Sequence, residues 1–279
     1  MLYVMNTFRC CWYLKEDAPS WELLARLPKP NRKFFGVCAV QSGILLTGGY
    51  HGNNKKDCFL FDTREKRWST MTPLLSGRCK HASVAHIGKV YVLGGEDDRD
   101  KRLQSVDVLD LKTKQWSPAP PMPKGLSDPM CISHGRHIFV FGGIEDGMTT
   151  SKMIMMFDSI WGEWTVRAEM PEPCRLGAAV SINNTMYIVG GYTQSCLKYN
   201  PDKDTWETLQ GKPKEKHGNA PAVTWQGKIL VPGGDVSSAM STRLVEVYDP
   251  ETDQWSSWPI SLREELSCHH MVNVDLHGI

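Results

Sequence analysis

The sequence lacks long apolar runs and any excess of charge of one sign. Its 279 residues carry 32 Lys and Arg against 31 Asp and Glu, for a net charge of +1. No overall field therefore favours nucleic acid or an acidic membrane as a partner. Apolar runs such as Ile138 to Phe141 end at glycine and are too short to span a bilayer. Met1 to Met5 has no basic region before it and is too short for the apolar core of a signal peptide.

The nine cysteines include no C-x-x-C pair, which removes the common zinc and redox motifs. The adjacent Cys10 and Cys11 suit neither a zinc site nor an easy disulfide. Cys38, Cys58 and Cys131 fall inside expected strands. We therefore expect reduced, half-buried thiols in a cytoplasmic protein.

What the sequence does contain is one pattern written five times: a β-rich apolar run, a pair of glycines and, further on, a tryptophan. The pairs begin at Gly48, Gly94, Gly142, Gly190 and Gly233, and the tryptophans that follow are Trp68, Trp116, Trp164, Trp206 and Trp255. The pairs therefore recur at nearly even intervals along the chain. The variable part is the loop after the glycines. A repeat of this length indicates stacked units around a shared core, and hence one domain.

Within one repeat the pattern predicts four strands. Residues 81–86 alternate, 90–93 are continuously apolar, 105–111 alternate again, and a short strand opens at Trp116. Asp110, Thr113 and Lys114 mark the turn between the last two strands. Four strands with tight turns and no helical period describe one blade of a β-propeller.

The two ends of the chain supply a sixth unit. Residues 269–274 predict a first strand, and Leu2 to Met5, Cys11 to Leu14 and the segment from Trp21 predict the second to fourth. Asn6 and Thr7 stand where the glycine pair is expected. Joining the ends pairs edges that would otherwise be exposed. We therefore predict an all-β, six-bladed propeller forming a single domain over 1–279, with blades at 1–27 plus 267–279, 28–73, 74–121, 122–170, 171–211 and 212–260.

The glycine pairs, strand pattern, aspartate and tryptophan together resemble the kelch repeat over essentially the whole chain. The six-fold count and split blade resemble the substrate-receptor domain of BTB–BACK–kelch adaptors for cullin-RING ubiquitin ligases. The resemblance implies that one mouth of the propeller binds a partner protein or peptide. It also implies a cullin scaffold and a homodimer partner, both reached through upstream BTB and BACK segments, and a cytoplasmic location.

The resemblance places the partner-binding residues on two sets of loops. The first set follows the glycine pairs and comprises Tyr50, Glu96, Ile144, Tyr192 and Asp235. The second leads into the first strands and comprises Arg32, Lys33, Phe34, Arg78, Lys80, Ser127, Asp128, Arg175, His217, Asn219, Ser267, His269 and His270. We expect Phe34, Tyr50 and Tyr192 to be anchors, because aromatic residues dominate interface energy. We also expect replacement of Arg32, Tyr50 or Arg78 by alanine to weaken binding without lowering the melting temperature.

Enzyme and metal functions find little support in the sequence. The histidines fall at scattered repeat positions, unlike those of copper-oxidase kelch propellers. The iron motif E-x-x-x-D-x-x-x-H begins at Glu96 and Asp100 but has Gln104 in place of the histidine, which leaves too few ligands. We expect no catalytic residues, metal or cofactor. Cys79 and Cys174 lie beside Lys80 and Arg175, which leaves a redox-sensing thiol as an alternative to ordinary loop cysteines.

The sequence therefore predicts a non-catalytic recognition domain that binds neither nucleic acid nor membrane. The first hypothesis is the substrate-recognition module of a cullin-RING ligase adaptor. The alternative is a kelch scaffold or actin-associated interaction domain unconnected with ubiquitination, since one fold serves many functions.

Overall fold

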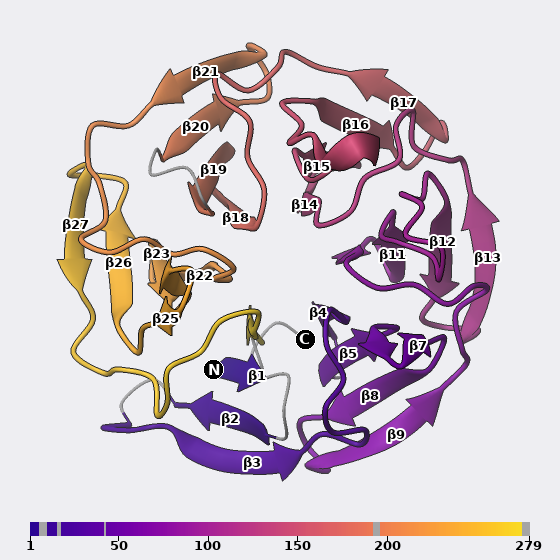
Figure 1. Cartoon of the computed structure of the whole chain (residues 1–279), viewed down its shortest axis with the longest axis horizontal. Helices are drawn as coiled ribbons and strands as arrows, with labels where there is room; N and C mark the ends of the chain where they lie inside the picture. Colours follow the sequence, from indigo (N-terminus) through magenta and orange to yellow (C-terminus); the bar gives the residue numbers. More distant parts are fainter. Residues whose placement is uncertain (6–9, 16–17, 42, 192–195, 275–279) are drawn as a thin grey trace.

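A computed structural model of the chain describes residues 1–5, 10–15, 18–41, 43–191 and 196–274. Within these residues six four-stranded antiparallel sheets stand around a central axis as the blades of a propeller (Figure 1). The prediction of an all-β, six-bladed propeller is confirmed. None of the described residues forms a helix long and apolar enough to cross a membrane.

Five blades are continuous in sequence, and their strands run from the axis outwards. The second blade holds β4 (Gly36–Val40), β5 (Gly43–Thr47), β8 (Cys58–Asp62) and β9 (Arg67–Met71). The third holds β10 (Ala82–His86), β11 (Lys89–Leu93), β12 (Val106–Asp110) and β13 (Gln115–Ala119). The fourth holds β14 (Met130–His134), β15 (His137–Phe141), β16 (Ile154–Asp158) and β17 (Glu163–Val166).

The last two continuous blades repeat this order. The fifth holds β18 (Gly177–Ile182), β19 (Thr185–Gly190), β20 (Leu197–Asn200) and β21 (Thr205–Thr208). The sixth holds β22 (Val223–Trp225), β23 (Lys228–Pro232), β26 (Val245–Asp249) and β27 (Gln254–Ser257). The loops after the glycine pairs add the hairpins β6 (Tyr50–His51) with β7 (Asn53–Asn54) and β24 (Asp235–Ser237) with β25 (Met240–Ser241), and the 3₁₀ turn η1 (Asp146–Met148).

The first blade is built from both ends of the chain, as predicted. Its strands are β28 (His270–Asn273), β1 (Leu2–Met5), β2 (Cys10–Leu14) and β3 (Glu22–Arg26). β1 pairs antiparallel with β28, from Leu2 opposite Asn273 to Met5 opposite His270. The ends of the chain therefore close the ring (Figure 1). Asn6 and Thr7 lie outside the described residues.

The core lies between neighbouring blades and explains the tryptophans. One cluster joins Leu45 of the second blade to Val92 and Trp116 of the third. The indole N–H of Trp116 donates to the carbonyl of Thr72 at 2.8 Å, across the gap between those blades. Trp164 and Trp206 repeat this bond to a carbonyl of the preceding blade. Each of these three tryptophans is therefore tied to the preceding blade by a bond from its indole N–H to a carbonyl.

The glycine pairs lie where consecutive blades touch most closely. The first glycine of each pair has a φ between +54° and +70°. A Cβ added there would lie 2.2–2.8 Å from a carbonyl oxygen of the next blade. The N–H of the second glycine donates to that same oxygen at 2.7–3.0 Å. Only glycine allows this approach, because any side chain would displace the neighbouring blade.

Candidate functional site

The candidate site is built from the segment that leads into the innermost strand of each blade, which we call the entry segment. In each entry segment a residue shortly before the strand has a left-handed backbone, with φ between +49° and +58°. These six entry residues are Phe34, Lys80, Asp128, Leu176, Asn219 and Cys268. Such a conformation costs about 1–2 kcal/mol for a residue other than glycine and persists only where surrounding contacts fix it.

Backbone hydrogen bonds between neighbouring blades supply those contacts. The N–H of Lys80 donates to the carbonyl of Phe34 at 2.9 Å, and the N–H of Asp128 donates to that of Lys80 at 2.7 Å. Asn219 donates to Leu176, and Cys268 to Asn219, at 2.9 and 3.1 Å. The entry residues thus form a ring around the axis. Backbone bonds that do not depend on side-chain identity hold it in two runs, Phe34–Lys80–Asp128 and Leu176–Asn219–Cys268.

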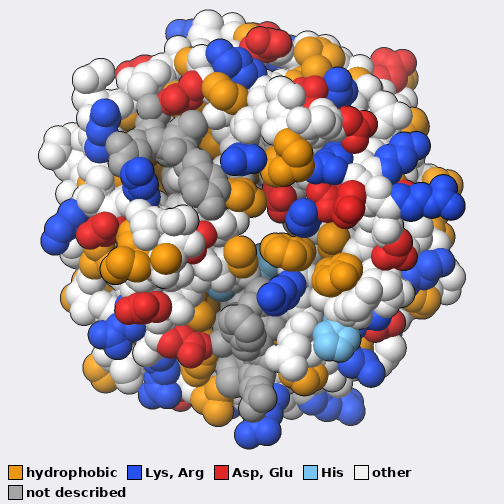
Figure 2. Space-filling model, in the orientation of Figure 1, with side chains coloured by type: hydrophobic (Ala, Val, Ile, Leu, Met, Phe, Trp, Pro, Cys, Tyr) orange, Lys and Arg blue, Asp and Glu red, His pale blue; other side chains and the backbone are white. Residues whose placement is uncertain are grey.

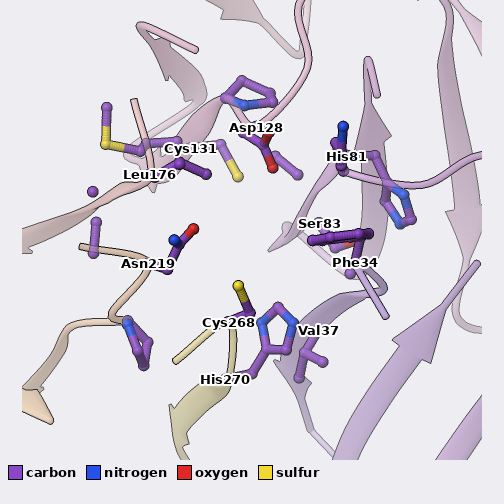
Figure 3. Close-up of a pocket in the computed structure, with 18 of the residues that line it drawn as sticks. Phe34, Val37, His81, Ser83, Asp128, Cys131, Leu176, Asn219, Cys268 and His270 are labelled. Carbon is purple, nitrogen blue, oxygen red and sulfur yellow. The ribbon is translucent and has the colours of Figure 1, made fainter. Parts of the chain in front are cut away.

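The ring surrounds a cavity of about 270 Å³ at the end of the central channel. All six entry residues line it, together with the start of each innermost strand. The labelled side chains of Phe34, Asp128, Asn219 and Cys268 converge on this space (Figure 3). Figure 2 shows an opening at the centre of the molecule, edged by hydrophobic, basic and acidic side chains.

The loops after the glycine pairs meet the entry segments beside this cavity. Single antiparallel bridges join Lys33 to Tyr50, Cys79 to Glu96, Ser127 to Ile144 and Gly218 to Asp235. The structure therefore brings together the two loop sets that the resemblance implied. We call the surface they form around the cavity the mouth.

Part of the predicted set is accessible at the mouth. Tyr50 is 43% exposed. Lys33 is exposed as well, and the partly exposed members are Phe34, Lys80, Asp128, Arg175, Asn219, Asp235, Ser267 and His270. Tyr192 lies outside the described residues.

The other predicted residues are buried and at most 6% exposed: Arg32, Arg78, Glu96, Ser127, Ile144, His217 and His269. A side chain without accessible surface offers a partner nothing to bind. We therefore withdraw these seven as contact residues. The expectation that Arg32→Ala and Arg78→Ala would leave the melting temperature unchanged conflicts with their burial.

Two of these buried residues bind groups within their own blade and not a partner. Arg78 reaches Asp107 at 3.1 Å and donates to the carbonyls of Gly94 and Ser105. His217 lies 2.9 Å from Glu246 and 2.6 Å from the carbonyl of Gly233. Each side chain ties the first glycine of its pair to the third strand of the same blade. These residues hold the blade together.

Basic and acidic side chains at the mouth partly neutralise each other. Lys80 Nζ lies 2.9 Å from Glu96 and 5.5 Å from the centre of the Phe34 ring. Arg102 approaches the same carboxylate at 3.3 Å. The acidic and basic groups at this part of the mouth are therefore satisfied within the chain.

Three histidines and one cysteine near the mouth carry no charge near neutral pH. Burial lowers the pKa of His81 and of His269 to about 3, and that of His270 to about 4. Burial raises the pKa of Cys79 to about 12, and the nearby Glu96 raises it further. Together they outweigh the opposing effect of Lys80. The alternative of a low-pKa redox thiol is thus wrong for Cys79. Among the described residues, no group of three or more His, Cys, Asp or Glu is arranged to hold a metal ion.

Leu176 and Cys268 belong to the ring but were not among the predicted contact residues. A signal for Leu176 is present in the sequence. It precedes Gly190 by the same interval that separates Phe34 from Gly48, and the entry residues of the other continuous blades keep that spacing. Cys268 had no such marker, because its blade has no glycine pair at Asn6 and Thr7.

A family model described as the KLHDC2/KLHL20/DRC7 Kelch-repeats domain matches residues 34–221 and 118–275. The chain belongs to the kelch-repeat family. Kelch propellers are in general protein-interaction modules, and this one is related to the Kelch-like proteins. It is 38% identical over 233 residues to Kelch-like protein 24 of Rattus norvegicus, covering 84% of this chain and 38% of that protein.

The kelch propeller is also 30% identical over 258 residues to Kelch-like protein 35 of Mus musculus, covering 92% of this chain and 44% of that protein. The chain thus spans about two fifths of the length of these relatives. Among solved structures it is similar to the one titled "Structure of YjhT", with a TM-score of 0.79, 15% identity and coverage of 89% and 91% of the two chains. At that identity the likeness shows the fold alone.

Proposed function

We propose that this kelch propeller recognises a partner protein or peptide at the mouth. The observation that carries the proposal is the ring of six entry residues. Their backbones are fixed by bonds between blades, while their side chains differ in every blade and line a single cavity. A rigid framework that presents variable side chains and loops around a concavity is typical of a binding site.

The recognition domain acts, in this proposal, as the substrate-recognition module of a cullin-RING ligase adaptor in the cytoplasm. Support comes from the Kelch-like relatives, whose similarity extends over 84% and 92% of the propeller. The resemblance to BTB–BACK–kelch adaptors assigns the propeller to the substrate and the other segments to the cullin and to dimerisation. Those partners belong to the full gene product.

The binding site is tested with peptides selected from a displayed random library against the propeller. Lys33 and Tyr50 are joined by a backbone bridge and both are exposed, so Lys33→Ala with Tyr50→Ala removes mouth contacts and leaves the core intact. We expect affinity to fall at least about tenfold, as for an aromatic interface anchor.

Trp161→Ala is the matched control for that double variant. Trp161 is 71% exposed and lies in the turn between β16 and β17, at the ends of those strands away from the mouth. The substitution removes an exposed aromatic side chain and leaves the mouth unchanged. Unchanged affinity for Lys33→Ala with Tyr50→Ala would reject the mouth, as would a loss confined to Trp161→Ala.

The ligase assignment is tested with the full gene product. We expect the full gene product to co-precipitate with a cullin. We also expect proteins captured by the propeller to be ubiquitinated when the wild-type gene product is present, and not when the Lys33→Ala, Tyr50→Ala variant replaces it. A gene product that captures its partners at the mouth but neither binds a cullin nor promotes ubiquitination would be a scaffold.

A further inference from the structure

Asp128 is the acidic member of the entry ring, and among the described residues no cation forms an ion pair with its carboxylate. Its side chain points into the cavity (Figure 3). Its backbone N–H is bonded to the carbonyl of Lys80 at 2.7 Å. Across the described ranges no hydrogen bond or ion pair to the carboxylate is found. A carboxylate in a recess without a partner is a costly arrangement unless a ligand completes it.

Two of the cations that act on Asp128 have another partner. Lys80 is bonded to Glu96 at 2.9 Å, and Arg102 lies 3.3 Å from the same carboxylate. Lys80, Arg102 and Arg175 favour the ionised form of Asp128 from a distance, while Glu96 opposes it. Burial outweighs them and raises the pKa of Asp128 to about 7. The carboxylate is therefore short of positive charge.

The remaining walls of the cavity suit a long side chain with a basic end. Leu176 follows Asp128 in the ring, Phe34 stands beyond Lys80 on the other side, and both supply apolar surface to the cavity. The amide of Asn219 donates to Asp235 at 2.7 Å, which turns its carbonyl oxygen away from that carboxylate and leaves it able to accept. A basic side chain can lay its stem on apolar surface while its charged end meets acceptors.

The charge and volume of the cavity further limit the kind of side chain that it can accept. His81 and His270 line the cavity in their neutral form, so they do not compete for Asp128 as cations. An acidic group entering here would face the Asp128 carboxylate. The volume of about 270 Å³ lies below the roughly 300–1,000 Å³ of pockets for drug-sized ligands and fits one side chain.

We infer that the partner inserts a lysine or arginine side chain into the central cavity, where its charge pairs with Asp128 and its stem packs between Phe34 and Leu176. This inference rests on the proposed function and gives its site a specificity: a peptide with an accessible basic residue. Replacing one partner of a buried charge pair raises the dissociation rate and weakens binding strongly.

Peptides selected from the displayed library against the wild-type propeller test the inference. We expect a shared Lys or Arg among mouth-binding sequences and, from the loss of one buried charge pair, affinity at least about tenfold weaker for Asp128→Asn. Replacing the shared basic residue with glutamine should weaken binding to the wild type equally and have little further effect on Asp128→Asn. The peptide replacement needs no variant protein, so misfolding cannot mimic the result.

Asp100→Asn is the matched control. Asp100 has a φ of +58°, close to the +50° of Asp128, and is exposed in the loop after the second glycine pair. Asparagine tolerates this backbone, so both variants remove one charge without strain. Selected peptides without a basic residue, or equal affinity for wild type and Asp128→Asn, would overturn the inference.

The pH dependence gives a second readout. A basic side chain pairs with the ionised carboxylate, so binding should weaken as pH falls from 8 to 6, and Asp128→Asn should abolish this dependence. His81 and His270 stay neutral across that range, and so do Cys131 and Cys268, whose pKa values burial raises. A loss of affinity in the Lys33→Ala, Tyr50→Ala variant together with unchanged affinity in Asp128→Asn would reject this inference and leave the proposed function standing. Peptides that ignore all three positions would reject both.

Discussion

The buried pair of Arg78 and Asp107 allows a quantitative test of how a blade is held together. Arg78 has no exposed surface, and its guanidinium lies 3.1 Å from the Asp107 carboxylate. Replacing Arg78 with leucine leaves that carboxylate buried without its cation. Breaking such a pair from one side costs about 3–5 kcal/mol, which lowers Tm by roughly 5–9 °C in a chain of this size.

The next blade contains the apolar alternative at the same two positions. Leu126 stands as far before Gly142 in the sequence as Arg78 stands before Gly94. Met155 faces Val140 on the second strand as Asp107 faces Val92. We therefore expect the double variant Arg78→Leu, Asp107→Met to lie within about 2 kcal/mol of the wild type, because a buried ion pair replaced by apolar residues is often close to neutral.

Thermal and urea unfolding of the four proteins in this double-mutant cycle measures the coupling. The stability that Arg78→Leu loses relative to the wild type should also become smaller as pH falls from 7 to 5. Burial already raises the pKa of Asp107 against the opposing effect of Arg78, and protonation removes the unpaired charge. A double variant as unstable as the sum of the two single variants would refute the reasoning, since it would mean that the two side chains act independently.

Two further predictions concern the framework. Gly94→Ala should destabilise the propeller far more than Gly88→Ala. Both glycines have positive φ, but an added Cβ at Gly94 would lie 2.5 Å from the Leu126 carbonyl oxygen, whereas one at Gly88 would meet open space. Equal losses of Tm in the two variants would contradict a close contact between blades at Gly94. Stability should also fall as pH drops from about 6.5 towards 3, since the pKa of His81 and His269 is lowered to about 3 in the folded state and only the unfolded chain binds the protons. Each histidine contributes on the order of 2 kcal/mol of this loss by pH 5. A drop in Tm between pH 7 and pH 5 that is the same in His81→Gln as in the wild type would count against this.

The repeat made the framework predictable. Strand order, ring closure through β28 and β1, and the interblade bond of Trp116 all follow from a pattern that recurs with fixed spacing. The glycine pairs were predictable for the same reason, because a position that admits only glycine repeats wherever blades touch. What the repeat could not supply was the direction of each side chain in an entry segment.

The error over Arg78 shows why. A basic residue in a loop suggests a binding contact, and its acidic partner Asp107 lies much further along the chain, in a different strand. Only the folded blade shows that Asp107 faces inwards to meet it. Lys80, which follows Arg78 closely in the same segment, is in contrast partly exposed and lines the cavity.

Where the earlier position of an entry segment is polar, stability and recognition are therefore divided between two nearby positions. The earlier position, held by Arg78 in one blade and His217 in another, binds the glycine carbonyl and the third strand, so its replacement changes the free energy of unfolding. The later position is the entry residue, such as Lys80 or Asp128, whose side chain lines the cavity while the ring bonds there come from the backbone alone. The ring can then change its side chains without losing its shape. A kelch propeller built this way can acquire a new partner through the entry residues while its blades stay the same.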